Sequence, residues 1–598
     1  MNEPLKRPRD KSRTVTVTYD DTPGTALAIS FAPDCSGDER LQLLRRARRT
    51  IALREGPNRI HESDRGDHVV LTTRRPAPAR GVLTLAVRAT QNDDGRIPPS
   101  ACLDLDEDWV RVRTDPVALA AVYHGQGRRY AAVSTSCFVL AALHGAGLDE
   151  AAWAHLALLG FQLGTESPFH DVTRLGPGTM VELHHGRRRL VSEEPPTSVP
   201  EGPVPLRRIV TTMLDEHPEA VLELSGGLDS RTILAAIPPA RRRDLVTMTI
   251  GEPDSADVVI ARDIARDEGL RHIVLSDRCP SYTDPGEARR RCDAAALRYE
   301  CQTNVLASAV LGDVEERAPT GPRLTGVNGE YLRGFYYPGT RRRAPVSHST
   351  VGRLVRWRMV TNDRVTPDLF INEWWRDRRD NLVNEVTERL QARSPHLRRA
   401  TDEFYLYDRV ARWAGPSYTE ASRHRAVLAP FLHPDILATG QAIDPRMRAG
   451  SKALARLLEH LDPRLAARPL AGGIRPVDLA RGGVVATSRR GRTTAVKVGR
   501  KVAQRLTAHG RPPSGTATAL THLRATWLAE SPFADLHNVP FLRSDTLERL
   551  HEDPTSIDAA TASFLLNLSV ALDVLRHAAQ RPTPPERLPD ATDRGHHA

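Results

Sequence analysis

The chain has 598 residues and a formal net charge of +10, and 40% of its residues are hydrophobic and 26% are charged. This length predicts two or three domains, and the composition is typical of a soluble globular protein. No apolar run approaches the roughly 18 residues of a membrane span, and no signal peptide is recognisable, so we expect a cytoplasmic protein without a membrane partner. No nucleic-acid module accompanies the basic residues, which argues against nucleic acid as a partner. The six cysteines form no CxxC pair, which favours free thiols.

The first 195 residues predict a basic tail followed by a strand-rich domain. Residues 1–13 are polar and basic, and we expect them to be disordered. Over residues 14–195, short alternating runs such as "HVVLTT", "WVRVRT" and "GTMVELHHG" are separated by turn residues. This rhythm predicts two sheets packed on each other. The proline-rich stretch "EEPPTSVPEGPVP", residues 193–205, then predicts a domain boundary.

Residues 206–580 follow a different rhythm. The strand-like runs "AVLELS", "LVTMTIG" and "HIVLS" alternate with longer amphipathic segments such as "ADVVIARDIARDEGL". This alternation predicts a parallel α/β sheet. From about residue 351 the pattern becomes mostly helical, and the proline-rich, polar tail at 581–598 is expected to be disordered.

The string "SGGLDS" stands where the first of these strands meets a helix. In a parallel sheet this edge binds ligands, because helix N-termini present free amides there. Glycines let the backbone approach an anion, serines add hydroxyl donors, and the aspartate suits a bridging Mg²⁺. The loop therefore favours magnesium-bound pyrophosphate, although a structural turn with a helix cap is the alternative. Its residues are Ser225, Gly226, Gly227, Leu228, Asp229 and Ser230.

Lysine is scarce in this chain. Only five of the 84 cationic residues are lysines, and Lys452 lies far from the others. A compact ammonium can approach a single oxygen in a way that a planar guanidinium cannot. Lys452 is therefore a candidate for a chemical role.

These features resemble the asparagine-synthetase branch of the PP-loop ATP pyrophosphatase superfamily. The resemblance is carried by "SGGLDS", by "TMTIGEPDSADVVIARDIARDEGLRHIVL", by "LTGVNGE" and by "APFLHPDILATGQAIDPRMRAGSKALARLLEHLDP". Upstream, "VRTDPVALAAVYH" and "TESPFHDVTRLGPGTMVELHHG" resemble the amidotransferase domain fused to such synthetases. The resemblance implies an N-terminal Ntn-amidotransferase-like sandwich over residues 14–195. It implies a PP-loop ligase domain, with a parallel sheet and a helical extension, over residues 206–580.

The resemblance also implies a reaction that uses ATP and Mg²⁺. A substrate carboxylate attacks the α-phosphorus of ATP, pyrophosphate leaves, and an amine then attacks the acyl-adenylate. Asp229 and Glu330 would be the metal ligands, and Lys452 would stabilise charge on the phosphate and the oxyanion. The nucleotide would contact the 225–230 loop together with Ile250, Gly251 and Gly326.

Three positions depart from the family pattern. Asn2 stands where glutamine-dependent members have the nucleophilic cysteine, so we expect no glutaminase activity and a degenerate N-terminal domain. Val327 stands where asparagine synthetases have glutamate and β-lactam synthetases have tyrosine. Arg231 follows the loop, either as a nucleotide contact or as an exposed residue of the first helical turn. The residues considered as a replacement base are Glu403, Tyr407 and Asp408, each of which has a structural alternative in a helix.

The leading hypothesis is an amide or lactam synthetase of specialised-metabolite biosynthesis, such as antibiotic biosynthesis, with lasso-peptide macrolactam cyclisation as the most specific guess. Its substrate would be a small-molecule or peptide carboxylate, and a peptide cyclase would also have a leader-binding or protease partner. The basic stretch at 487–505 either docks such a partner or is a solvated surface. The alternatives are an asparagine synthetase that uses free ammonia and an inactive nucleotide-binding scaffold.

Overall fold

The computed structural model describes residues 24–56, 60–74, 76–78, 80–85, 97–192, 205–278, 284–361, 365–422, 425–482, 514–530 and 533–580. Five sequence features therefore lie wholly or largely outside the described residues: Asn2, the tails at 1–13 and 581–598, the proline-rich break and the basic stretch at 487–505. None of the cysteines in the described ranges forms a disulfide.

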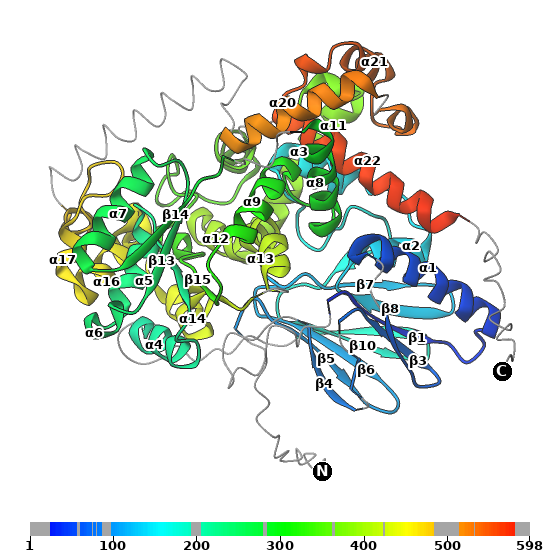
Figure 1. Ribbon diagram of the computed structural model, residues 1–598, viewed down its shortest axis with the longest axis horizontal. Helices are drawn as coiled ribbons and strands as arrows, with labels where there is room; N and C mark the ends of the chain where they lie inside the picture. The colour runs from blue at the N-terminus through cyan, green and yellow to red at the C-terminus, as the bar shows by residue number, and fades with distance from the viewer. Residues whose placement is uncertain are drawn as a thin grey trace, which may run out of the picture.

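Two antiparallel sheets face each other in the N-terminal part, at the lower right of Figure 1. The six-stranded sheet has the order β2-β3-β1-β8-β7-β9, and the five-stranded sheet has the order β11-β10-β6-β5-β4. Strand β6 alternates buried and half-buried residues, and its inward side chains join a core shared by both sheets. The strands are β1 (Ala26–Phe31), β2 (His61–Asp64), β3 (His68–Thr72), β4 (Gly81–Thr84), β5 (Ala101–Leu105), β6 (Val110–Thr114), β7 (Tyr123–Gln126), β8 (Tyr130–Ser134), β9 (Thr173–Arg174), β10 (Thr179–His184) and β11 (Arg187–Ser192). The sheet-on-sheet prediction is confirmed.

Helices also belong to this part, which the alternating pattern did not predict. They are α1 (Gly37–Glu55), α2 (Cys137–His144) and α3 (Glu150–Leu159). Helix α1 begins with a capping box, in which Ser36 Oγ accepts from the Glu39 N–H at 3.3 Å and Glu39 Oε2 accepts from the Ser36 N–H at 3.0 Å. The string "SGDE" was thus the available signal for this helix.

The C-terminal part contains the predicted parallel sheet, which is confirmed. Its strand order is β14-β13-β12-β15-β16, and every pairing is parallel. The strands are β12 (Val221–Glu223), β13 (Val246–Ile250), β14 (Arg271–Leu275), β15 (Arg323–Leu324) and β16 (Val427–Leu428). The order reverses between β12 and β15, which makes the carboxyl ends of these two strands the favoured place for a ligand.

Helices surround this sheet and continue beyond it, as the sequence predicts after residue 351. They are α4 (Leu206–Glu216), α5 (Leu228–Ala236), α6 (Pro239–Arg242), α7 (Ala256–Glu268), α8 (Pro285–Arg298), α9 (Val305–Arg317), α10 (His348–Leu354), α11 (Asn372–Arg393), α12 (Leu397–Phe404), α13 (Gly415–Ala421), α14 (Pro434–Ala442), α15 (Pro445–Arg448), α16 (Lys452–Leu461), α17 (Pro463–Ala467), α18 (Pro476–Arg481), α20 (Ser514–Ala529), α21 (Ser544–Glu552) and α22 (Ala559–Ala579). Short 3₁₀ turns include η2 (Gly329–Arg333), η4 (Pro367–Leu369), η6 (Pro430–Leu432), η7 (Ala449–Ser451), η8 (Ala534–Asn538) and η9 (Pro554–Ser556). Two segments are π-helical, η3 (Val355–Met359) and η5 (Tyr405–Ala414).

Helix α22 closes the structure against its N-terminal part. It contacts α1, α2, α8 and α9, and Figure 1 shows it in red beside the blue α1. By length and composition α22 could cross a membrane, which the sequence analysis did not anticipate, but 61% of its apolar window is buried inside the protein. Its Phe564 ring packs edge-on against Trp153 at 5.6 Å. This burial is that of a core helix.

Candidate active site

The 225–230 loop joins the carboxyl end of β12 to the first turn of α5. The Ser225 N–H donates to Ser230 Oγ at 3.0 Å, and the two serine hydroxyls also lie 3.0 Å apart. Gly227 is the N-cap residue of α5 and offers no side chain to the first-turn amides. Those amides therefore remain available to an anion, and the helix dipole favours negative charge at the same place.

Two glycines after β15 bring a second backbone segment against this loop. A Cβ on Gly326 would lie 2.8 Å from the Ser230 backbone nitrogen, and a Cβ on Gly329 would lie 2.5 Å from Asp229 Cγ. Between them, Asn328 adopts a φ of 71° and its Nδ2 donates to the Phe431 carbonyl at 3.2 Å. Only glycine permits this approach without a shift of the loop.

Arg333 lies between the two carboxylates to which the sequence assigns a metal role. Its Nη2 is 2.8 Å from Asp229 Oδ2 and 2.9 Å from Glu330 Oε1. Burial raises the pKa of Asp229 to about 7, against the lowering effect of the Arg333 charge and with a further rise from Glu330. The structure thus brings Asp229 and Glu330 to one place and adds a guanidinium that the sequence analysis missed. The three-residue spacing of Glu330 and Arg333 in a helical turn was the available signal.

The residues around the loop fit a magnesium–nucleotide complex. Asp229 Oδ1 is buried and has no hydrogen-bond partner among the residues that the structure describes. A buried carboxylate oxygen in this state can accept a cation, and carboxylates are preferred Mg²⁺ ligands. Because Arg333 contacts both acids, a cation held by Asp229 and Glu330 would compete with its guanidinium.

Lys452 begins α16, and this helix packs against both α5 and η2. The turn before it, η7, also contacts η2 and contains left-handed Gly450 and Ser451, with φ of 71° and 65°. This sharp turn starts the helix beside the segment that carries Glu330. The lysine that composition singled out therefore begins a helix that packs against η2 and α5, although it is more than 200 residues away from the glycine loop in the sequence.

Of the residues considered as a base, Asp408 has a structural role. It is buried, forms an ion pair with Arg393 and lies 3.6 Å from Arg389 Nη1. Tyr407 accepts a hydrogen bond from Gln441 at 3.4 Å. Burial raises the pKa of Glu403, and Val327 packs against the hydrophobic core.

Tyr405 is the residue of this segment that reaches the acids, and the sequence analysis missed it. Its hydroxyl donates to Glu330 Oε2 at 3.2 Å. Burial, followed by the charge of Glu330, raises the pKa of Tyr405 well above its usual value. The phenol therefore stays protonated and positions Glu330. Tyr405 begins the π-helical segment η5, and such segments are frequent at functional sites.

Arg231 is not the exposed residue of the first helical turn that was one of its two expected roles. Its side chain is buried, and it donates to the backbone carbonyls of Arg468 at 2.7 Å and Pro469 at 3.1 Å. A further bond of 3.4 Å reaches the carbonyl of Gly226. Arg231 thus ties the glycine loop to the chain after α17.

A cavity of about 1150 Å³ borders the same end of the sheet. Ile250, a predicted adenine contact, lines it at the end of β13, and Gly251 follows with a φ of 149°. Tyr418 also lines the cavity, and its hydroxyl lies 3.4 Å from Oγ1 of Thr325, the residue before Gly326. Other walls come from α3, α9, η5 and α22, so the cavity lies between the N-terminal helices and the helical region.

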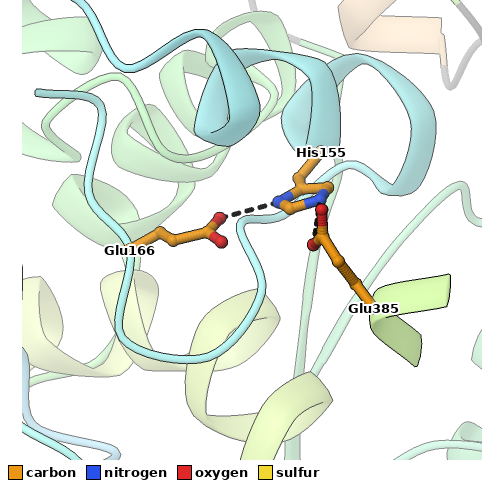
Figure 2. Close-up of side chains that lie close together, drawn as sticks. All are labelled: His155, Glu166 and Glu385. Atoms are coloured by element: carbon orange, nitrogen blue, oxygen red, sulfur yellow. Dashed lines mark hydrogen bonds and ion pairs between the residues drawn. The ribbon is translucent and has the colours of Figure 1, made fainter. Parts of the chain in front are cut away.

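A second polar cluster lies apart from the loop, and Figure 2 shows its geometry. His155 Nδ1 is 2.7 Å from Glu166 Oε2, and Nε2 is 2.9 Å from Glu385 Oε2. Burial alone would lower the pKa of His155, but hydrogen bonds and charges from the two glutamates raise it to about 9. The three side chains are close enough to hold a metal ion. However, the glutamates contact opposite ring nitrogens, and one ion cannot bind both nitrogens, so the arrangement is that of an imidazolium clamp.

Comparison with known proteins finds one protein family to which part of the chain is similar. Residues 205–278 match the family model described as asparagine synthase, and this segment carries β12, the glycine loop, α5, β13, α7 and β14. Glu330 and Lys452 lie outside the matched segment. The comparison with curated proteins found no match. Residues 205–278, which contain the glycine loop and three of the parallel strands, are therefore similar to the asparagine synthase family.

Proposed function

We propose that this protein is an AMP-forming amide ligase that adenylates a substrate carboxylate and then couples it to an amine. The observation that carries the proposal is the meeting of three segments at the sheet's switch point. The 225–230 loop offers amides and hydroxyls, η2 brings Glu330 beside Asp229, and α16 begins with Lys452 next to η2. Amides and hydroxyls can bind phosphate oxygens, the two carboxylates can hold a metal ion, and the lysine can neutralise negative charge, so together the three segments suit a bound triphosphate.

In the first step, a carboxylate oxygen of the substrate attacks the α-phosphorus of ATP and the bond to pyrophosphate breaks. The loop amides and the hydroxyls of Ser225 and Ser230 bind the leaving group. Mg²⁺ held by Asp229 and Glu330 would neutralise charge on it. In the second step, the amine forms a bond to the acyl carbon, AMP leaves, and the amine proton passes to a base. Lys452 stabilises the negative oxygen atoms in both steps.

We further propose that the amine belongs to the substrate itself, which makes the product a lactam. The cavity of about 1150 Å³ beside the sheet ends supports this proposal, because this volume suits a substrate as large as a peptide segment. Lasso-type macrolactam formation, with a leader-binding or protease partner, is the most specific form of the proposal.

Pyrophosphate release tests the reaction. Full-length protein is incubated with ATP, Mg²⁺ and a panel of amino-carboxylate small molecules and peptides, with Asp229→Asn as the matched inactive variant. We expect pyrophosphate and AMP in equal amounts from at least one substrate, and about a hundredfold less from the variant. Measurable ATP binding without pyrophosphate release from any carboxylate would instead support the nucleotide-binding scaffold, to which the Arg333 contacts also lend some weight.

The source of the amine is tested separately with glutamine alone. We expect no glutamate to appear, because the proposed reaction takes its amine from the substrate itself. Robust glutaminase activity would contradict this interpretation. Product formation that requires added ammonium would favour the asparagine synthetase type.

A further inference from the structure

Two arginines in the wall of the large cavity have no carboxylate partner among the described residues. Arg358 comes from η3 and Arg409 from η5, and both line the cavity. Arg358 Nη2 donates to the Phe335 carbonyl at 2.9 Å, while its Nε is buried without a hydrogen-bond partner. The Arg409 guanidinium carbon lies 4.9 Å from the Phe335 ring centroid and 5.2 Å from that of Trp413.

Tyr336 lies beside this pair and interacts with both arginines, and no carboxylate of the described residues forms an ion pair with either arginine. Burial lowers the pKa of Arg358, Tyr336 partly opposes this effect, and the neighbouring Arg409 lowers the pKa further. Two guanidinium groups that are close enough to repel each other in a partly desolvated wall are unfavourable unless an anion joins them.

Three other arginines of the same cavity lie beside a carboxylate. Arg54 contacts Glu300 at 3.3 Å, Arg323 contacts Glu223 at 3.1 Å, and Arg425 contacts Glu315 at 3.8 Å. Arg358 and Arg409 differ from these three arginines in having no carboxylate partner among the described residues.

The pair lies one aromatic layer away from the two acids. The Phe335 ring packs against Tyr405 at 4.9 Å, and the Tyr405 hydroxyl donates to Glu330. Neither the 225–230 loop nor Glu330 lines the cavity, so an anion bound there by the pair would be distinct from phosphates at the loop.

We propose that Arg358 and Arg409 bind a carboxylate of the acyl substrate other than the one that is activated. A guanidinium fork matches a carboxylate by paired N–H donors, and two forks can hold one carboxylate from both sides. The inference rests on the proposed function and makes it more specific, because the acyl substrate is then at least a dicarboxylate that occupies the cavity.

Glutarate is the probe, and the intrinsic fluorescence of Trp413 is the signal, because its indole is half exposed and lies against Arg409. Glutarate should cause a saturable change in the full-length protein, and neutral glutaramide should cause none. The change should disappear in Trp413→Phe. Arg409→Gln and Arg358→Gln should each raise the half-saturating glutarate concentration at least tenfold. Arg298→Gln is the matched control, because Arg298 is an exposed arginine of the same cavity, and it should stay within twofold of wild type.

A fluorescent ATP analogue separates this inference from the proposed function. The affinity of the protein for this analogue should stay within twofold of wild type in the three arginine variants, and their circular dichroism spectra should be unchanged. Loss of its affinity in Arg409→Gln, or competition between glutarate and inorganic phosphate, would assign the pair to the nucleotide and overturn the carboxylate site. Absence of a saturable change, or an equal loss in Arg298→Gln, would also overturn it. Glutarate binding in a protein that binds no ATP would keep the anion site and refute the ligase.

Discussion

At the scale of single residues, Arg333 is the unexpected member of the site. One nitrogen atom of its guanidinium, Nη2, contacts both Asp229 and Glu330. This arrangement keeps the two carboxylates close without mutual repulsion. It also means that a metal must compete with a tethered charge before it can bind.

Arg333→Gln should therefore make the protein depend on Mg²⁺ for stability. Without metal, two adjacent carboxylates lose their partner, at a cost of about 1–3 kcal/mol. We expect a lower melting temperature without Mg²⁺, a larger gain on its addition than in wild type, and half-saturation of nucleotide binding at lower Mg²⁺. Arg343→Gln, which changes an exposed arginine, should show none of these effects. A variant that requires more Mg²⁺ than wild type would contradict the competition.

Lys452→Arg tests whether the charge or the shape of Lys452 matters. Arginine keeps the charge but cannot bring a single compact donor to one oxygen. We expect amide formation to fall by about 10²–10³-fold, which corresponds to the roughly 3–4 kcal/mol of a lost oxyanion donor. Binding of the fluorescent ATP analogue and the melting temperature serve as controls. A rate close to wild type would refute the assigned role.

At the scale of elements, the chain order β12, α5, β13, α7, β14 could be predicted from the sequence because each strand ends in a turn and each helix carries its own periodicity. The position of Lys452 against η2 could not be predicted, since it depends on how α16 packs over η2 and α5. Tyr405 and Arg358 were missed for the same reason. Their partners come from distant segments, and in the sequence they look like ordinary helix residues.

The contact between η2 and the glycine loop can be tested by adding one methyl group. Gly329→Ala places a Cβ 2.5 Å from Asp229 Cγ, so the loop or the turn must move. We expect a loss of about 1–3 kcal/mol from overpacking, measured as a lower melting temperature, and weaker nucleotide binding. Gly37→Ala in α1, where an added Cβ meets nothing within 4 Å, is the matched control and should be neutral. Unchanged nucleotide affinity in Gly329→Ala would show that this contact does not shape the site.

At the scale of the whole molecule, the His155 clamp joins α3 and the loop after it to α11. Burial raises the pKa of Glu385, but the hydrogen bond and charge of His155 and the charges of Arg389 and Arg378 lower it overall. The clamp therefore connects the N-terminal part to the helical region through charge as well as through apolar contacts.

We expect the free energy of unfolding to fall as the pH rises, because the His155 clamp loses its proton. The pKa of His155 is about 9 in the folded protein and about 6.5 when unfolded, so its contribution is complete below pH 6.5 and is lost as the pH rises to 9. The difference corresponds to about 3 kcal/mol. We expect His155→Gln to show a smaller change in melting temperature between pH 6.5 and 9.5 than wild type. An equal change in both proteins would assign the pH dependence to other groups.

Helix α22 has a consequence for the order in which the protein can mature. It shares one apolar core with α1 and α2, yet it is separated from them by the whole parallel sheet in the sequence. During synthesis on the ribosome, the apolar faces of α1 and α2 stay exposed to solvent until residues Ala559–Ala579 leave the ribosome. The helices α1 and α2 therefore cannot complete their apolar core before this last helix is translated, and nascent chains are expected to need chaperone protection until then.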